Sequence, residues 1–75
     1  MMEFEKMQGI IAEVLDIDKS KITLESTFEE LGADSLDVLQ IIMGIEDTFE
    51  IKIPDEATEK IVTVSDAVEQ IKTVL

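Results

Sequence analysis

The side chains that could carry chemistry in this chain are its carboxylates and hydroxyls, because histidine, cysteine, tryptophan and tyrosine are all absent. There is therefore no thiol nucleophile, no disulfide scaffold and none of the usual zinc ligands. The common general base at neutral pH is missing too, which argues against catalysis by the chain itself. The sequence predicts no catalytic residue and no dedicated metal site, and we expect the chain to act through a partner or an attached group.

A serine hydroxyl is the natural point for such an attachment, and one of the four serines differs from the others in its position. Three of them fit the ordinary roles of helix caps or solvated loop residues: Ser20, Ser26 and Ser65. Ser35 begins an expected helix at the end of a long loop, so its hydroxyl should be accessible. A phosphate ester there would lie at the positive end of the helix, although nearby Asp34 and Asp37 oppose that effect.

The elements that position Ser35 follow from the apolar spacing. A helical period predicts a first helix over roughly 3–15. Residues 16–34 have no sustained period and form a long loop, which is unusual in so small a domain unless it is functional. Five apolar side chains can pin this loop to the core: Ile17, Ile22, Leu24, Phe28 and Leu31.

The second helix should begin at Asp34 or Ser35, with Asp34 as its cap and Asp37 three residues later, and run to about Glu50. A short third helix is expected over roughly 56–61. A last helix, capped by Thr63 with Asp66 at its third position, presents an apolar stripe: Val64, Ala67, Val68, Ile71 and Val74. We expect an all-α fold, a small four-helix bundle in a single domain over 1–75.

The second helix carries more apolar surface than one core face requires. The core face should consist of five residues: Val38, Ile41, Ile42, Ile45 and Phe49. Leu36, Leu39 and Met43 lie on a different stripe. Either this helix is central and packed on both sides, or the second stripe is an exposed strip that a partner covers, with acids around it.

Acidic residues dominate the charge, with 18 Asp and Glu against 6 Lys and a net charge of −12. That sign argues against nucleic-acid binding, while the 45% hydrophobic content is too high for a disordered acidic tail. Eleven acids fall between 25 and 59, where Lys52 is the single cation: Glu25, Glu29, Glu30, Asp34, Asp37, Glu46, Asp47, Glu50, Asp55, Glu56 and Glu59. This segment is either a solvated surface or one that attracts a basic partner.

Other functions find less support in the sequence. Carboxylates such as Glu29, Glu30, Asp34 and Asp37 could hold a divalent cation weakly, but they lack the spacing of a calcium loop, so we favour solvation. No apolar run approaches the roughly 18 residues of a membrane span, and the N-terminus has no secretory pattern. We expect a cytoplasmic protein.

Three blocks of sequence bring these features together: "LGADSLD" around Ser35, "IIMGIEDTFEIKIPDE" and "EKIVTVSDAV". With the first helix and the long loop, they resemble the acyl carrier protein family over nearly the whole chain, in particular the small free-standing carriers of bacterial fatty acid synthesis. The resemblance implies that 4′-phosphopantetheine is attached to Ser35 by a phosphopantetheinyl transferase, from coenzyme A with magnesium. Acyl groups would then ride as thioesters on the thiol of this arm, which explains a carrier without cysteine.

The resemblance also assigns roles to other residues. Eight match positions that modifying enzymes, fatty acid synthesis enzymes and acyltransferases recognise: Asp34, Leu36, Asp37, Leu39, Met43, Glu46, Asp47 and Asp55. Three would line a sheath for the acyl chain: Ile45, Ile53 and Ile61. Four residues depart from the common pattern: Leu39, Gln40, Gly44 and Thr58. We expect a monomeric, non-catalytic carrier; a carrier for polyketide or D-alanyl transfer, or an unmodified acidic interaction module, are the alternatives.

Overall fold

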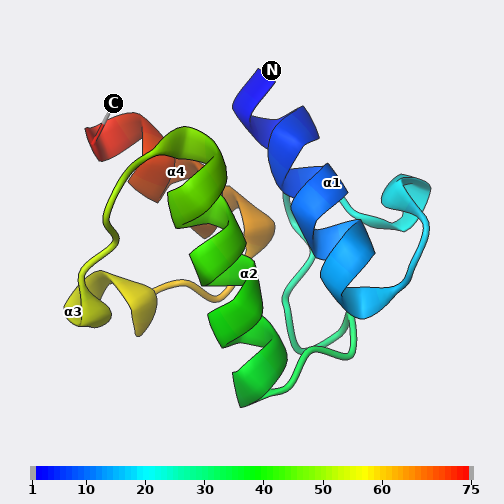
Figure 1. Cartoon of the computed structure of the whole chain (residues 1–75). Helices are drawn as coiled ribbons and strands as arrows, with labels where there is room; N and C mark the ends of the chain where they lie inside the picture. The colour runs from blue at the N-terminus through cyan, green and yellow to red at the C-terminus, as the bar shows by residue number, and fades with distance from the viewer. Residues whose placement is uncertain (1, 75) are drawn as a thin grey trace.

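The computed structural model describes residues 2–74, which form four α-helices in the order shown in Figure 1. The helices and one 3-10 turn have these bounds: α1 Met2–Leu15, the 3-10 turn Lys19–Lys21, α2 Ser35–Phe49, α3 Asp55–Thr58 and α4 Val64–Val74. No strand is found over the described range, apart from a single bridge between Thr27 and Thr63. The predicted all-α bundle, with three longer helices and one short one, is confirmed.

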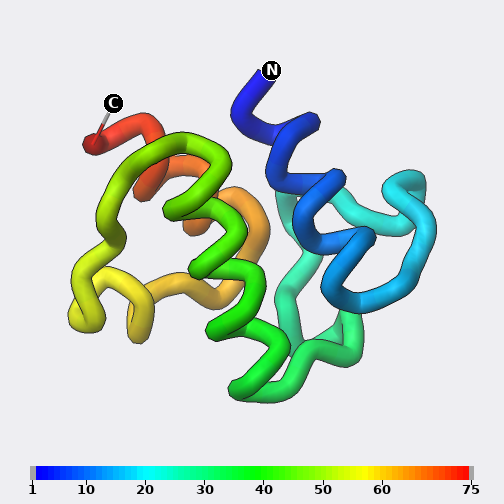
Figure 2. Tube along the Cα trace, in the orientation of Figure 1, coloured from blue at the N-terminus to red at the C-terminus, as the bar shows by residue number. Residues whose placement is uncertain are grey.

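Helices α1 and α2 pack against each other with opposite chain directions, α4 lies behind α2, and α3 lies at its side (Figure 1). The loop from α1 to α2 passes around the outside of α1 before it reaches the start of α2 (Figure 2). All the longer helices contribute to one core: Met7, Ile11, Ile22, Phe28, Ile41, Ile42, Ile45, Ile53, Ile61, Val64, Ala67, Val68 and Ile71. Full burial of each large side chain contributes about 1.5–3 kcal/mol relative to exposure.

The long loop is pinned as expected, by Ile22 and Phe28, which are buried, and by the other three apolar residues, which are partly buried against the core. The Gln8 side-chain amide on α1 adds a polar tie, because it donates to the carbonyl oxygen of Ile22 at 2.8 Å. The sequence predicts that Ser26 is a cap or a solvated residue. It is instead buried, and its hydroxyl accepts a hydrogen bond from the backbone N–H of Thr23 at 3.0 Å.

Two helix predictions need correction. The sequence predicts α3 over 56–61, but the helix begins at Asp55 and ends at Thr58. It ends early because the next residues form a tight turn, in which Lys60 N–H donates to Ala57 and Ile61 N–H donates to Thr58. The sequence predicts Val74 on the apolar stripe of α4. It lies in the final turn of α4 and is 48% exposed.

Gly44 lies where α1 packs closely on α2. A Cβ atom added there would stand 2.9 Å from Cγ2 of Ile10, a β-branched side chain with little freedom to move aside. Helix propensity alone predicts that glycine weakens α2 here, by up to about 1 kcal/mol relative to alanine. The structure supplies the compensating reason, because the missing side chain lets α1 pack closely on α2.

Candidate functional site

Ser35 is the first residue of α2 and is exposed. Its neighbours hold it in place through a capping box in which Asp37 N–H donates to the Asp34 carboxylate at 2.9 Å and Asp34 N–H donates to the Asp37 carboxylate at 3.3 Å. The expected cap is therefore confirmed in both halves. Because each carboxylate faces a backbone N–H, part of its charge is compensated beside Ser35.

The turn that brings the chain to Ser35 depends on Gly32. Its φ of 86° lies in the left-handed region that glycine adopts without strain. The Gly32 N–H donates to Glu29 at 3.0 Å, and the Ala33 N–H donates to Phe28 at 3.0 Å, so the turn is closed on itself. The "LGAD" stretch thus delivers Ser35 from a fixed turn rather than from a loose loop.

An open hollow of about 590 Å³ lies beside Ser35, between α2, the end of the long loop and the turn after α3. Its walls are mainly apolar, with Glu29 and Asp34 as the acids: Phe28, Glu29, Ala33, Asp34, Ser35, Val38, Thr58, Ile61 and Val62. A group bonded to the Ser35 oxygen would start at the rim of this hollow. The apolar walls of the hollow could then cover the apolar parts of that group.

The predicted acyl-sheath residues divide into two groups. Ile61 lines the hollow, whereas Ile45 and Ile53 are 1% and 7% exposed and belong to the packed core. Phe28, Ala33 and Val62 also line the hollow, and the sequence analysis did not predict them there. The signal available for Val62 was a valine directly after the buried Ile61, in a short stretch that no helical period explains.

The second apolar stripe of α2 is exposed, so the alternative in which this helix is packed on both sides is wrong. Leu36, Leu39 and Met43 are 64%, 52% and 58% exposed. They follow one another along the outer side of the helix, starting next to Ser35. Solvent-exposed apolar side chains arranged in this way form a strip that a partner could cover.

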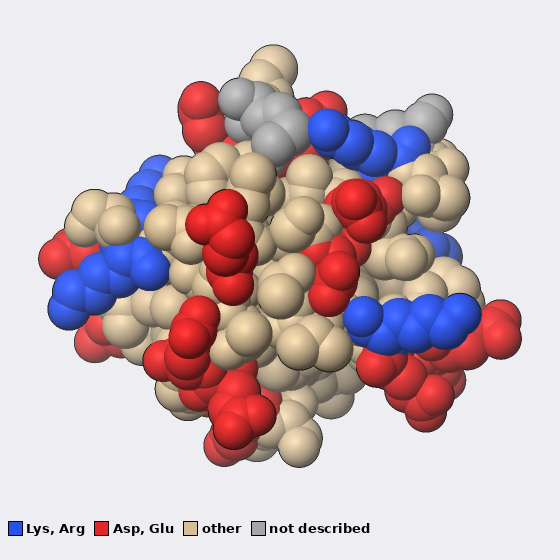
Figure 3. Space-filling model, turned by 180° about the vertical axis from the view of Figure 1, so that it is seen from behind, with Lys and Arg blue, Asp and Glu red and all other residues tan. Residues whose placement is uncertain are grey.

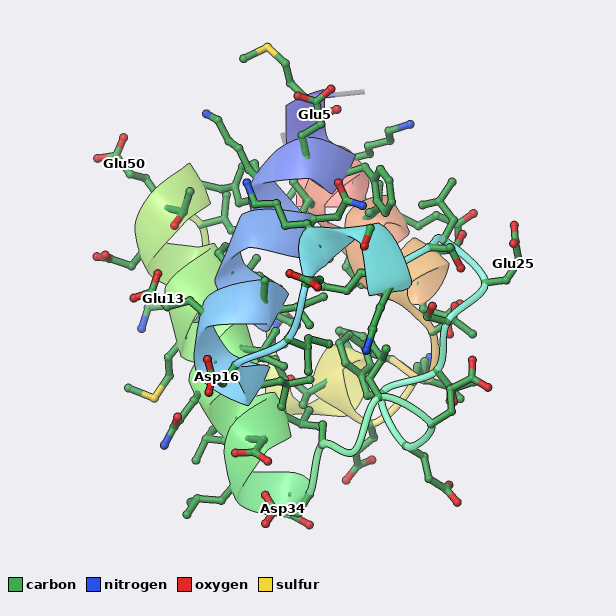
Figure 4. All side chains as sticks on the ribbon, turned by 90° about the vertical axis from the view of Figure 1, so that its right-hand side faces the viewer. Glu5, Glu13, Asp16, Glu25, Asp34 and Glu50 are labelled. Atoms are coloured by element: carbon green, nitrogen blue, oxygen red, sulfur yellow. The ribbon has the colours of Figure 1, made fainter. Side chains whose placement is uncertain are left out.

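Acidic side chains stand at both ends of this strip. Asp34 lies at the first end of α2 and Glu50 at the other (Figure 4). A second open hollow at the Glu50 end is lined by residues of α2 and of the segment that follows it: Met43, Gly44, Glu46, Asp47, Glu50, Ile51 and Lys52. Of the predicted contact residues beyond the capping box, Asp47 and Asp55 are exposed and Glu46 is half-buried.

The acidic segment 25–59 does not form a single face. Glu25 projects from the long loop on the side away from α2 (Figure 4). Acidic side chains are also spread over the face opposite to that of Figure 1, with lysines toward its two sides (Figure 3). The acidic charge is therefore spread over more than one face, and Asp34 and Asp37 are the acids nearest to Ser35 along the chain.

Within residues 2–74, no three carboxylates come together in a group able to hold a metal ion, so the acids suggested as weak ligands do not form such a site. No helix in the same range has the length and apolar character needed to cross a membrane.

Residues 5–71 match the protein family described as the phosphopantetheine attachment site, a class of domains defined by that prosthetic group. The chain is 50% identical to an acyl carrier protein of Clostridium acetobutylicum, over 95% of this chain and 94% of the relative. It is 51% identical to acyl carrier proteins of Helicobacter acinonychis and Helicobacter pylori, over 96% of this chain and 94% of each relative. The chain therefore belongs to the acyl carrier protein family.

This membership confirms the predicted class, a carrier rather than a catalyst, and its prosthetic group, covalently bound 4′-phosphopantetheine. The described residues fit that group. An exposed hydroxyl stands at the start of a helix, where a phosphodiester is favoured, and an adjoining hollow has mainly apolar walls. When bound, the group supplies the thiol that the chain itself lacks.

Proposed function

We propose that Ser35 is the attachment point and that the protein carries growing fatty acyl chains as thioesters for the enzymes of fatty acid synthesis. The observation that carries this proposal is the placement of Ser35, which is exposed at the start of α2 and stands on the rim of the hollow. A phosphopantetheinyl transferase would move the arm from coenzyme A to the Ser35 oxygen, forming a phosphodiester and releasing the nucleotide.

The chain contributes position rather than reactivity to this transfer. The capping box fixes the backbone on both sides of Ser35, so this residue is held at the start of α2. The positive end of α2 favours the phosphodiester once it has formed. The chain has no histidine to accept the hydroxyl proton, so we expect the transferase to remove it.

Recognition is assigned to the exposed strip and the acids around it. Leu36, Leu39 and Met43 would be the apolar anchors, and acids such as Asp47 and Asp55 would steer partners that carry basic docking patches, acyltransferases among them. We propose a monomer that works in the cytoplasm. For the cargo, Ile61 in the hollow would meet the acyl chain first, with Ile45 and Ile53 behind it.

The proposal is tested by incubating the protein with coenzyme A, magnesium and a phosphopantetheinyl transferase, followed by intact-protein mass spectrometry. The wild type and Ser20→Ala, which removes another exposed serine, should each gain one arm. Ser35→Ala should gain none, and unchanged labelling of that variant would sink the proposal.

The alternatives predict different results. An unmodified acidic interaction module would gain no arm in the wild type, and its binding would survive Ser35→Ala. A carrier for polyketide or D-alanyl transfer would be labelled at Ser35 but would hold another cargo, which the mass of the protein purified from its own host reveals. We expect fatty acyl groups.

A further inference from the structure

The turn between α3 and α4 is held by one carboxylate. An oxygen of Asp66 accepts hydrogen bonds from the backbone N–H groups of Val62 and Thr63, each at 3.0 Å. In return, the Thr63 hydroxyl accepts from Asp66 N–H at 3.1 Å. The Thr63–Asp66 exchange is a capping box, whereas the bond to Val62 N–H lies one residue outside that motif.

The same turn is tied from its other side by the long loop. Phe28 N–H donates to the Val62 carbonyl at 3.2 Å, and Val64 N–H donates to the Ser26 carbonyl at 3.0 Å. Thr27 and Thr63 face each other as an antiparallel bridge between these ties. Both backbone groups of Val62 are therefore occupied, one by the loop and one by Asp66.

Val62 matters because it stands in the wall of the hollow beside Ser35. Its side chain is 58% exposed, while its neighbour Ile61 is 9% exposed. Both residues and Phe28 line that hollow. Helix α3, which precedes them, has four residues, too few to fix this wall without ties from elsewhere.

We propose that Asp66 is a positioning residue for the carrier site: it holds Val62 as the outer rim of the hollow, so that an apolar group attached through Ser35 is covered. The inference rests on the proposed attachment at Ser35. Without the carboxylate, Val62 N–H loses its partner and the turn is free to swing away from α2, which uncovers the hollow. A residue that only caps α4 would not have this effect.

The first measurement follows the turn itself, in protein without the arm. Amide hydrogen exchange is compared for the wild type, Asp66→Ala, Asp66→Asn and Glu69→Ala, the last of which removes an exposed acid from the same helix. In Asp66→Ala, exchange at Val62 and Phe28 should rise about three- to tenfold more than at core amides such as Ile41, as expected for loss of a single hydrogen bond. Asp66→Asn keeps an oxygen acceptor and should recover part of the protection, and Glu69→Ala should match the wild type.

The second measurement follows the cargo. Octanoyl and acetyl groups are loaded on the arm, and cleavage of each thioester by hydroxylamine is timed. Asp66→Ala should cleave the octanoyl thioester about three- to tenfold faster than the wild type. The acetyl thioester should be cleaved at an unchanged rate, because two carbons offer little apolar surface to bury. Ile11→Val, which weakens the core away from the hollow, controls for general loss of stability and should show neither change.

The outcomes separate this inference from the proposed function. Equal exchange at Val62 and at core amides in Asp66→Ala, or equal acceleration of both thioesters, would leave Asp66 as a cap alone and overturn the inference. A wild-type chain that accepts no arm would refute the attachment at Ser35, while the exchange measurement would still decide what Asp66 does to the turn.

Discussion

The carboxylate of Glu46 accepts a hydrogen bond from the backbone N–H of Ile53 at 2.8 Å. This bond joins the second half of α2 to the extended segment that leads to α3, and so fixes how that segment leaves the helix. Resemblance had assigned Glu46 to partner contact. The structure gives the same carboxylate an intramolecular partner, so a loss of binding in a Glu46 variant has two possible sources.

We expect Glu46→Ala to lower the free energy of unfolding by about 1–2 kcal/mol, because Ile53 N–H is left without its charged acceptor. Glu46→Gln keeps an acceptor oxygen and should recover most of this loss. Asp47→Ala removes an exposed acid next to it and should change stability by about 0.5 kcal/mol or less. Urea denaturation of the three variants measures this, and equal losses for Glu46→Ala and Asp47→Ala would contradict it.

Gly44→Ala tests the contact between α1 and α2. The new Cβ, 2.9 Å from Cγ2 of Ile10, should cost about 1–3 kcal/mol, more than the roughly 1 kcal/mol of helix propensity that alanine gains. We therefore expect Gly44→Ala to destabilise the protein. In an Ile10→Ala background the clash is gone, and the same change should stabilise it by about 1 kcal/mol. Additive effects in this double-mutant cycle would show that Ile10 is not the obstacle.

Glu50, the C-terminal cap that follows α2, lies in the left-handed region, at φ 54° and ψ 49°, where a side chain with a Cβ is strained. Glu50→Gly should raise the free energy of unfolding by about 0.5–1 kcal/mol and the melting temperature by several degrees. Glu50→Gln removes the same charge without relieving the backbone and serves as the control. If both variants melt at the same temperature, any gain comes from charge alone.

The features that could be predicted from the sequence are local. The apolar period of α2 places Ile41, Ile42 and Ile45 in the core, and the spacing of Asp34 and Asp37 gives the cap beside Ser35. In both cases the residues that give the signal lie within a few positions of the core face or helix cap that they predict. The sequence also separates the two apolar stripes of α2, but it leaves open whether the second is buried, and the structure decides that it is exposed.

The features that were missed join distant parts of the chain. The wall of the hollow brings Phe28 against Val62, and the burial of Ser26 depends on the same pairing of the loop with the turn before α4. Backbone hydrogen bonds between such segments produce no periodic pattern of apolar residues in either segment, so the sequence gives no signal for them. The early end of α3 has a different, local origin, because Lys60 N–H and Ile61 N–H donate to Ala57 and Thr58 in a tight turn that does not continue the helix.

The stability of the α3–α4 turn should depend on pH through Asp66. Hydrogen bonds from the backbone N–H groups of Thr63 and Val62 lower the pKa of Asp66 below its ordinary value of 3.8. The ionised carboxylate therefore stabilises the folded state above that value, and this contribution is lost as the pH falls through the lowered pKa. The stability difference between wild type and Asp66→Asn should be largest near neutral pH and shrink as the pH falls below 3.8 and through the lowered pKa. A difference that grows on acidification, or one that Glu69→Gln reproduces, would contradict this origin.

The net charge of −12 predicts that salt stabilises the protein. At about 0.1 M salt the screening length is about 10 Å, which weakens repulsion among acids spread over several faces. The melting temperature should rise with sodium chloride, and less steeply in a variant with Asp47→Asn and Glu59→Gln, two exposed acids. Magnesium chloride at equal ionic strength should give a similar rise, since no metal-holding group of three carboxylates occurs within residues 2–74. A melting temperature that stays flat or falls across the sodium chloride series would refute the role of repulsion, and a much larger rise with magnesium would indicate specific binding.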